Sequence, residues 1–126
     1  MSDLYLTNKL TTIQKQNFYK SMANNNLELF ISYIIVYDIF EEVSQSGNNW
    51  TVFHYAMYNG KIDIINFCLE YLYCLNLIDK ILKIKTNDNK CPILCLLSSK
   101  ELNDEQKKRI YFKIILFINF QSVMKY

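Results

Sequence analysis

Apolar and polar residues form blocks along the chain that predict helices joined by short polar turns. The first block, residues 11–40, is interrupted by three asparagines at 24–26, which tolerate left-handed backbone angles. This block therefore predicts two helices, the second running from Leu27 toward Val36. Thr11 and Gln14 stand three residues apart, as in a capping box, so we expect the first helix to begin there.

The second block repeats this plan after a polar string at 44–50 (SQSGNNW), which predicts a loop. A short helix is predicted over 52–58 and ends at Asn59 and Gly60, because Gly can take the left-handed conformation after a helix. A longer helix is predicted from Ile62 to about Leu75. Its apolar residues recur at spacings of three and four and predict one buried stripe: Ile64, Ile65, Cys68, Leu69 and Leu72.

The third block follows the polar stretch 85–90. Pro92 suits the first position of a helix, where its missing N–H costs nothing, and a short helix is predicted from there to about Leu97. Asn103 and Gln106 predict a capping box that opens the last helix, which runs to about Val123. No alternating pattern of useful length predicts a strand, so the expected fold class is all-α, with roughly six helices.

The chain also resembles itself. Residues 18–33 align with residues 53–68 at an offset of 35, so that Met22 meets Met57 and Asn25 meets Gly60. A shift of about 40 brings 51–53 onto 91–93. The repeated unit is a helix, a turn, a second helix and an extended loop.

The central unit carries a specific series of residues: Thr51-Val52-Phe53-His54-Tyr55-Ala56, then Gly60, then the apolar pair Ile64-Ile65. This series resembles the ankyrin repeat, whose pattern is T-P-L-H-x-A-A, then x-x-G, then a second helix with V-V-x-x-L-L. Asn48 and Asn49 take the place of the hairpin tip of that family. The flanking units depart from the pattern in three ways: Gln16 and Tyr19 replace the Thr and His of the first unit, Cys91 and Leu94 replace them in the third, and the third turn lacks Gly.

The resemblance implies a single domain over 1–126, an ankyrin-like helix-turn-helix solenoid of about three repeats at 11–46, 47–86 and 87–126. Four residues of the central repeat would be structural. Thr51 would cap the first helix, His54 would hydrogen-bond the backbone of loops and brace the next repeat, Ala56 would allow close helix packing, and Gly60 would make the turn.

For function, the resemblance implies a non-catalytic protein–protein interaction module, a scaffold whose partner protein binds the concave face. The partner-binding candidates are Asn48, Asn49, Trp50, Tyr55, Tyr58 and Asn59, and weaker candidates are Lys20, Asn24, Asn87 and Asp88. A second interpretation of the three aromatic side chains stays open, namely partial burial against the adjacent repeat.

The last helix is apolar nearly all round between Ile110 and Phe120. Such a helix needs cover on more than one side. It either packs wholly within the chain or is covered in part by another protein, which would make the chain an obligate small structural subunit of a large multiprotein or ribonucleoprotein assembly. Aromatic residues make up 15% of the chain, which slightly favours the second alternative.

Composition and charge exclude other classes. Hydrophobic residues make up 51% of the chain and charged residues 21%, enough apolar surface to fold. The net charge of +2 is too weak to indicate nucleic-acid binding. We interpret the basic cluster 107–109, with Lys100 and Lys113 nearby, as a solvated helix face with i,i+4 pairing. No apolar stretch is long enough for a membrane span.

Candidate chemistry is sparse. His54 is the only histidine, and we expect no catalytic, cofactor or metal site on it. The carboxylate pairs 41–42 and 104–105 resemble solvated helix ends. The spacing of the four cysteines fits no zinc motif, and the first eight residues lack the apolar run of a secretory leader. We therefore expect reduced cysteines in an intracellular, cytoplasmic protein.

Overall fold

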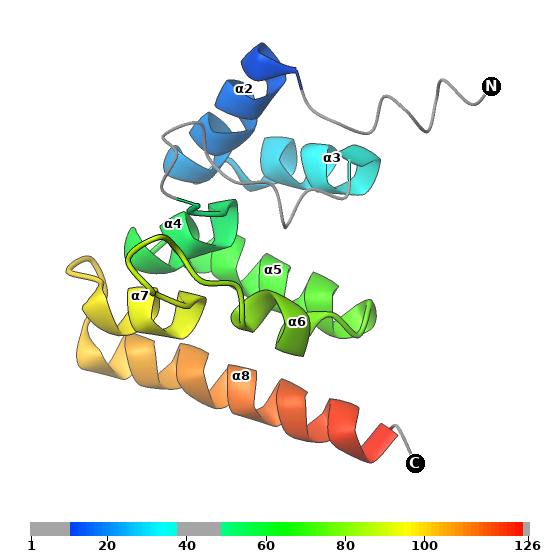
Figure 1. The fold of residues 1–126 in the computed structure, drawn as a ribbon, viewed down its shortest axis with the longest axis vertical. Coiled ribbons are helices and arrows are strands. Elements are labelled where there is room, and N and C mark those ends of the chain that lie inside the picture. The colour runs from blue at the N-terminus through cyan, green and yellow to red at the C-terminus, as the bar shows by residue number, and fades with distance from the viewer. Residues whose placement is uncertain (1–10, 38–48, 125–126) are drawn as a thin grey trace.

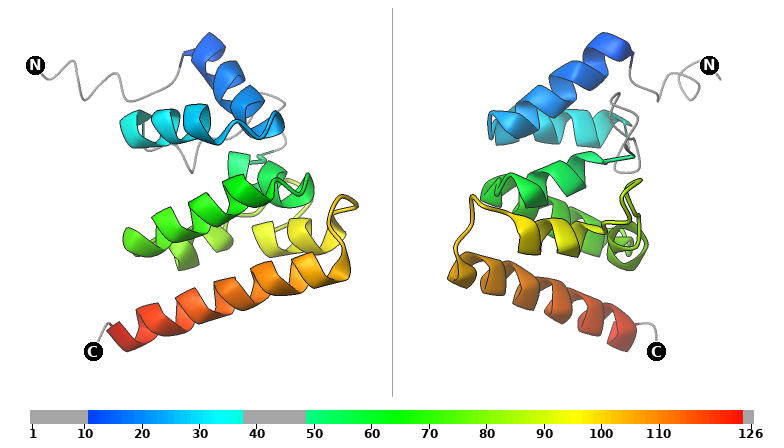
Figure 2. Two further views of the ribbon diagram at one scale, coloured as in Figure 1. Left: turned by 180° about the vertical axis from the view of Figure 1, so that it is seen from behind. Right: turned by 60° about the vertical axis from the view of Figure 1, so that its left-hand side comes forward.

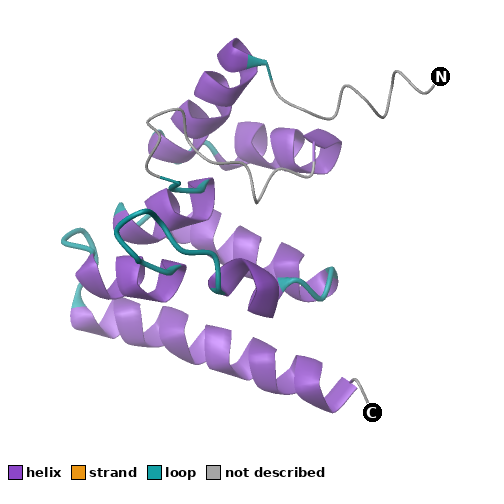
Figure 3. Cartoon of the chain, in the orientation of Figure 1, coloured by secondary structure: helices purple, strands orange, loops and turns teal. Residues whose placement is uncertain are grey.

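Helices separated by short turns make up the part of the chain that this computed structural model describes, residues 11–37 and 49–124. No strand is present in these two ranges, so the expected all-α class is confirmed (Figure 3). The described helices are α2 (Thr12–Ala23), α3 (Leu27–Tyr37), α4 (Val52–Tyr58), α5 (Ile62–Cys74), α6 (Ile78–Leu82), α7 (Pro92–Ser98) and α8 (Asp104–Met124). The predictions made for residues 1–8, for 41–42 and for most of the loop 44–50 lie outside the described residues.

The helices pair as three hairpins that follow one another along the longest axis of the molecule (Figure 1). The hairpins are α2 with α3, α4 with α5, and α7 with α8. Their first helices form one row, in which α4 packs between α2 and α7. Their second helices form another row, in which α5 packs against α3 and α8, and α6 packs against both α5 and α8 (Figure 2).

One cluster of buried apolar side chains runs through all three hairpins, from Phe18 on α2 to Ile114 on α8. The stripe predicted on the second helix of the central unit is buried in full: Ile64, Ile65, Cys68, Leu69 and Leu72. Aromatic rings join neighbouring hairpins within this core. Phe30 meets Phe67 edge-on with centroids 6.2 Å apart, and Tyr73 stacks on Phe117 at 4.6 Å. Because each hairpin buries its apolar face on a neighbour, the hairpins stabilise one another.

The first helices of the hairpins begin at intervals of 40 residues, with N-caps at Thr11, Thr51 and Cys91. The three caps share one extended backbone conformation, with φ/ψ of −67°/168°, −84°/170° and −84°/167°. At the offset of 35, which also pairs the C-caps Asn24 and Asn59, Gln16 corresponds to Thr51, but Gln16 lies inside α2 and is not its N-cap. The helix α2 begins five residues earlier, where Thr11 and Gln14 form the predicted capping box.

The turns inside the hairpins follow the offset of 35 residues. Asn25 and Gly60, which the alignment pairs, both have positive φ, at 54° and 67°. Asn tolerates this conformation and Gly adopts it freely, which explains the residue types. The third hairpin turns differently, since no residue between Ser98 and Asp104 has positive φ. Its five-residue connection ends at the predicted capping box of Asn103 and Gln106.

The helix α6 was not predicted. It has only five residues, and its N-cap Leu77 makes no side-chain capping bond. Its apolar residues Ile78, Ile81 and Leu82 are buried, so packing against α5 and α8 stabilises it. Tertiary contacts of this kind leave no periodic signal in so short a segment.

Candidate protein-binding surface

The loop between α6 and α7 is attached to α4 by the buried side chain of His54. The Nδ1 of His54 accepts a hydrogen bond from the backbone N–H of Thr51 at 3.1 Å, and the Nε2 of His54 lies 3.0 Å from the carbonyl oxygen of Ile84. A carbonyl only accepts, so the ring is the neutral tautomer with its proton on Nε2. The hydroxyl of Thr51 accepts from the backbone N–H of His54 at 3.3 Å, which caps α4. Burial lowers the pKa of His54, in agreement with a neutral ring.

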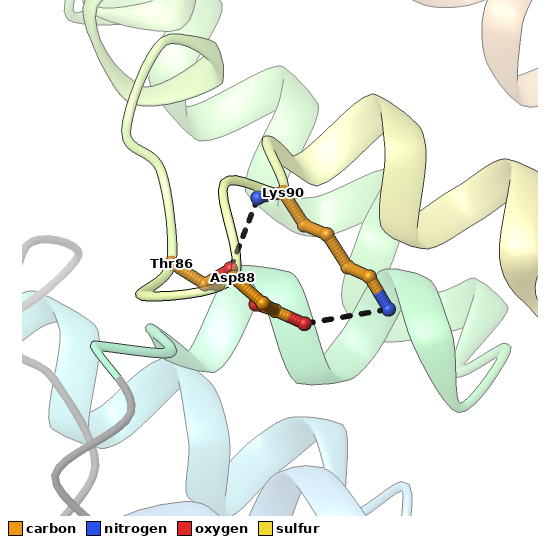
Figure 4. Close-up of polar contacts among 3 residues, drawn as sticks. All are labelled: Thr86, Asp88 and Lys90. Atoms are coloured by element: carbon orange, nitrogen blue, oxygen red, sulfur yellow. Dashed lines mark hydrogen bonds and ion pairs between the residues drawn. The ribbon is translucent and has the colours of Figure 1, made fainter.

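The same loop is braced at its tip. Thr86 accepts a hydrogen bond from the backbone N–H of Lys90 at 3.0 Å and donates one to the carboxylate of Asp88. The Lys90 ammonium reaches back to within 3.5 Å of that carboxylate (Figure 4). The hydrogen bond from Thr86 lowers the pKa of Asp88, with a contribution from the Lys90 charge. The Nδ2 of Asn49 donates to Oδ1 of Asn87 at 2.8 Å, so the segment before α4 touches the segment before α7.

An aromatic cluster covers the start of α4. Trp50 packs on Tyr55 with ring centroids 4.9 Å apart and meets Tyr58 edge-on at 5.7 Å. Tyr19 on α2 meets Tyr55 edge-on at 5.7 Å, and its hydroxyl donates to the carbonyl oxygen of Trp50 at 3.2 Å. All four side chains are half-buried. The aromatic residues therefore serve two purposes, since they join neighbouring helices and also leave part of each ring accessible.

Two hollows lie side by side on this surface. The first has a volume of about 410 Å³ and lies between α2 and α4; its lining residues are Lys15, Gln16, Tyr19, Lys20, Met22, Ala23, Tyr55 and Asn59. The second has a volume of about 450 Å³ and lies between α4 and the loop that precedes α7; its lining residues are Trp50, Tyr55, Tyr58, Asn59, Asn87 and Asp88. Tyr55 and Asn59 belong to both hollows, so they form the ridge between them.

The structure brings most of the sequence-predicted binding residues together here. Trp50, Tyr55, Tyr58 and Asn59 line the hollows, while Asn49 is exposed beside them and bonded to Asn87. Of the weaker candidates, Lys20, Asn87 and Asp88 also line a hollow, and Asn24 is the exposed C-cap of α2. Asn48 lies outside the described residues.

Lys15, Gln16 and Tyr19 were missed as surface residues. The offset of 35 pairs Lys15 with Trp50 but pairs Gln16 and Tyr19 with the buried Thr51 and His54, so it gives no surface signal for these two residues. The four structural residues occupy the positions expected of them. Thr51 caps α4, His54 and Ala56 are fully buried, and Gly60 makes the turn.

The basic residues of α8 have local partners. Arg109 pairs with Glu105 at 3.0 Å, and Lys107 donates to the carbonyl oxygen of Leu97 at 3.0 Å. Lys113 reaches Glu70 on α5 at 3.1 Å. The Arg109–Glu105 pair matches the expected i,i+4 pairing, whereas Lys107 bonds α7 and Lys113 bonds α5, so these two side chains are not simply solvated.

Other reactive groups are buried or scattered. Burial raises the pKa of Cys68 far above its usual value and that of Cys95 to about 11, so both thiols stay protonated. Across residues 11–37 and 49–124, no three His, Cys, Asp or Glu side chains group in a way that could hold a metal ion. None of the described helices is both long and apolar enough to cross a bilayer.

Comparison with known proteins identifies no relative: no protein-family model, no curated protein and no solved structure matches the chain.

Proposed function

We propose that the protein is a non-catalytic, ankyrin-like protein-binding module whose partner binds across the two hollows beside α4. The arrangement of the hairpins supports an ankyrin-like solenoid. First helices stack on first helices, N-caps recur every 40 residues, and the side chain of His54 braces the loop of the next unit. A stack of this kind presents one continuous surface formed by successive units, which suits an extended protein ligand.

The observation that carries the proposal is the shared ridge of Tyr55 and Asn59. Two hollows that meet at one ridge can hold two neighbouring side chains of a single partner segment. The first hollow is lined mainly by apolar atoms and suits an aliphatic or aromatic side chain of the partner. Its wall includes Tyr19 and Tyr55, and tyrosine is one of the residue types that contribute most to the binding energy of protein–protein interfaces. Asn59, on the ridge itself, supplies an amide that can hydrogen-bond the backbone of such a segment.

The state of His54 supports a non-catalytic function. Both ring nitrogens already have protein partners, and the ring is buried, so the imidazole has no face for a substrate. It is also the only histidine of the chain. The charged side chains that line the hollows are Lys15 and Lys20 in the first and Asp88 in the second, so the carboxylate and the two ammonium groups lie on different sides of the ridge.

A photo-reactive amino acid at two matched positions tests the proposal. Placed at Asn59 on the ridge, it should cross-link one partner protein; placed at Ser32, an exposed position on α3, it should not. Binding of that partner should then weaken at least tenfold in Lys20→Glu and stay unchanged in Lys100→Glu, which reverses an exposed charge on the connection to α8. Equal cross-linking from Ser32, or equal affinity of the two charge variants, would contradict the assignment.

The exposed apolar side of α8 favours a second candidate function, an obligate structural subunit of a larger assembly. Phe112, Leu116 and Phe120 are all exposed on this helix. Expression of the chain alone distinguishes the two candidates. A monodisperse protein that unfolds cooperatively supports the binding module, and aggregation relieved only by co-expression supports the obligate subunit. We propose an intracellular, cytoplasmic location for either one, since the four cysteines are unpaired.

A further inference from the structure

One side of α8 is apolar and uncovered. Its inner side chains Ile110 and Ile114 are buried against the rest of the fold, whereas Phe112, Leu116 and Phe120 are 63%, 52% and 53% exposed. These three residues follow one another at intervals of four, so they form a single row on the outer side of the helix. The helix α8 that carries this row lies at the end of the molecule opposite α2 (Figure 1).

The row is symmetric about its central residue, since Leu116 has a phenylalanine four residues before it and another four residues after it. A two-fold interface uses the same surface of both subunits, so residue i meets residue j and residue j meets residue i. An antiparallel pair of α8 helices centred on Leu116 would place Phe112 of each copy on Phe120 of the other. We propose that this row is the self-association surface of the protein and that it binds α8 of a second copy in antiparallel orientation.

The charges on the helix select this orientation. Lys108 and Arg109 stand just before the row on the exposed side, and the only charged residue within 110–120, Lys113, is turned inward to Glu70. A parallel pair would bring the two basic ends together. In the antiparallel pair the two Lys108 residues lie about 24 Å apart at a rise of about 1.5 Å per residue, beyond the screening length of about 8 Å at physiological salt.

The area available indicates a weak and reversible dimer. A fully buried aromatic side chain contributes about 150–250 Å², and the three residues of the row are about half exposed. With half-buried Ile115 and exposed Tyr111 at the edges, the pair would bury at most roughly 1,000 Å² in total, less than the usual specific interface. We expect monomers at low micromolar concentration and dimers at concentrations about a hundredfold higher.

Sedimentation of the whole chain measures this association. The apparent mass should rise with concentration from 15.1 kDa toward twice that value. Leu116→Glu places two carboxylates on the two-fold axis and should abolish the rise, whereas Leu94→Glu, a matched change at an exposed leucine of α7, should not. A chain that stays monomeric at all concentrations, or a Leu116→Glu variant that still dimerises, would overturn the proposal.

Disulfide trapping tests the orientation separately. With the more accessible Cys74 and Cys91 replaced by Ser, Leu116→Cys should form a covalent dimer with itself under mild oxidation. Phe112→Cys should not link to itself but should link to Phe120→Cys when the two variants are mixed. Self-linking of Phe112→Cys without mixed linking would overturn the antiparallel arrangement. None of these outcomes depends on the binding of a partner at the hollows. That binding is measured separately with the Lys20→Glu variant.

Discussion

Tyr19 and His54 make equivalent long-range contacts one hairpin apart. The hydroxyl of Tyr19 on α2 donates to the carbonyl oxygen of Trp50 at 3.2 Å, and the Nε2 of His54 on α4 donates to that of Ile84 at 3.0 Å. The two residues are 35 positions apart, and each reaches the segment that leads into the next hairpin. A phenol and an imidazole thus fulfil the same bracing role, which residue identity alone does not reveal.

The brace from Tyr19 can be removed without disturbing the ring. Tyr19→Phe deletes the hydroxyl that bonds Trp50 and should lower the free energy of unfolding by about 0.5–1.5 kcal/mol, the usual net value of such a hydrogen bond. Urea denaturation followed by circular dichroism measures the change. Tyr111→Phe, at an exposed tyrosine of α8, serves as the control and should stay within about 0.5 kcal/mol of wild type. Equal losses in the two variants would show that the brace contributes nothing.

The single histidine predicts a pH dependence of stability. Burial lowers the pKa of His54 in the folded protein below its ordinary value of 6.5. Above pH 6.5 the ring is neutral in both states, and stability is at its full value. Below that pH the unfolded chain takes up the proton more readily than the folded one, so the free energy of unfolding should fall as the pH falls through the folded pKa.

Urea denaturation between pH 7.5 and 5 measures this effect. His54→Gln should be less stable than wild type at pH 7.5, because the contacts with Thr51 and Ile84 are lost, but its stability should vary less across this range. Since the chain has no other histidine, the difference between the two curves isolates this ring. Parallel curves for the two proteins would mean that the ring is not buried as described.

Gly60 is constrained by its backbone angle and by its neighbours. Its φ is 67°, and a Cβ placed there would lie 3.0 Å from Cβ of Glu101 and 3.0 Å from Cγ of Leu102. Gly60→Val should therefore lower the free energy of unfolding by more than about 1 kcal/mol, and Gly60→Ala should show much of the same loss. Asn25→Ala is the matched control, since it has a similar φ of 54° and already carries a Cβ. If Asn25→Ala costs as much as Gly60→Ala, the crowding by the Glu101–Leu102 segment is refuted.

The N-cap of α7 offers a stabilising substitution. Cys91 has the same backbone conformation as Thr51 but makes no side-chain capping bond. Cys91→Thr would place a hydroxyl where it can accept from the backbone N–H of Leu94 and should raise the free energy of unfolding by about 1 kcal/mol. Cys91→Ala, which lacks a cap as the wild type does, is the reference. The interpretation fails if the threonine variant is no more stable than the alanine variant in thermal or urea denaturation.

Much of the helical structure could be predicted because its signals are local. Capping pairs such as Thr11 with Gln14 and the turn at Gly60 fix helix ends within a few residues, and the stripe from Ile64 to Leu72 identifies the buried side of α5. The helix α6 could not be predicted in this way, because it is stabilised by burial between α5 and α8 rather than by caps or periodicity.

The candidate surface was predictable in part. The resemblance of the central unit identified Trp50, Tyr55, Tyr58 and Asn59, which line the hollows. The α2 side of the surface and the contact between Asn49 and Asn87 depend on how successive units stack, and no local pattern encodes that arrangement. The same applies to the exposed row on α8, since an all-round apolar helix does not reveal which side the fold leaves uncovered.

The central claim is that the three hairpins stack to share one core, and ring-to-ring nuclear Overhauser effects test it most directly. Three aromatic pairs join neighbouring hairpins, namely Tyr19–Tyr55, Phe30–Phe67 and Tyr73–Phe117, with centroids 5.7, 6.2 and 4.6 Å apart. The account predicts cross-peaks for all three pairs, together with one for Phe18–Phe30 inside the first hairpin at 5.0 Å. A spectrum that shows the Phe18–Phe30 cross-peak but lacks the other three would mean that the hairpins form without stacking, and would contradict it.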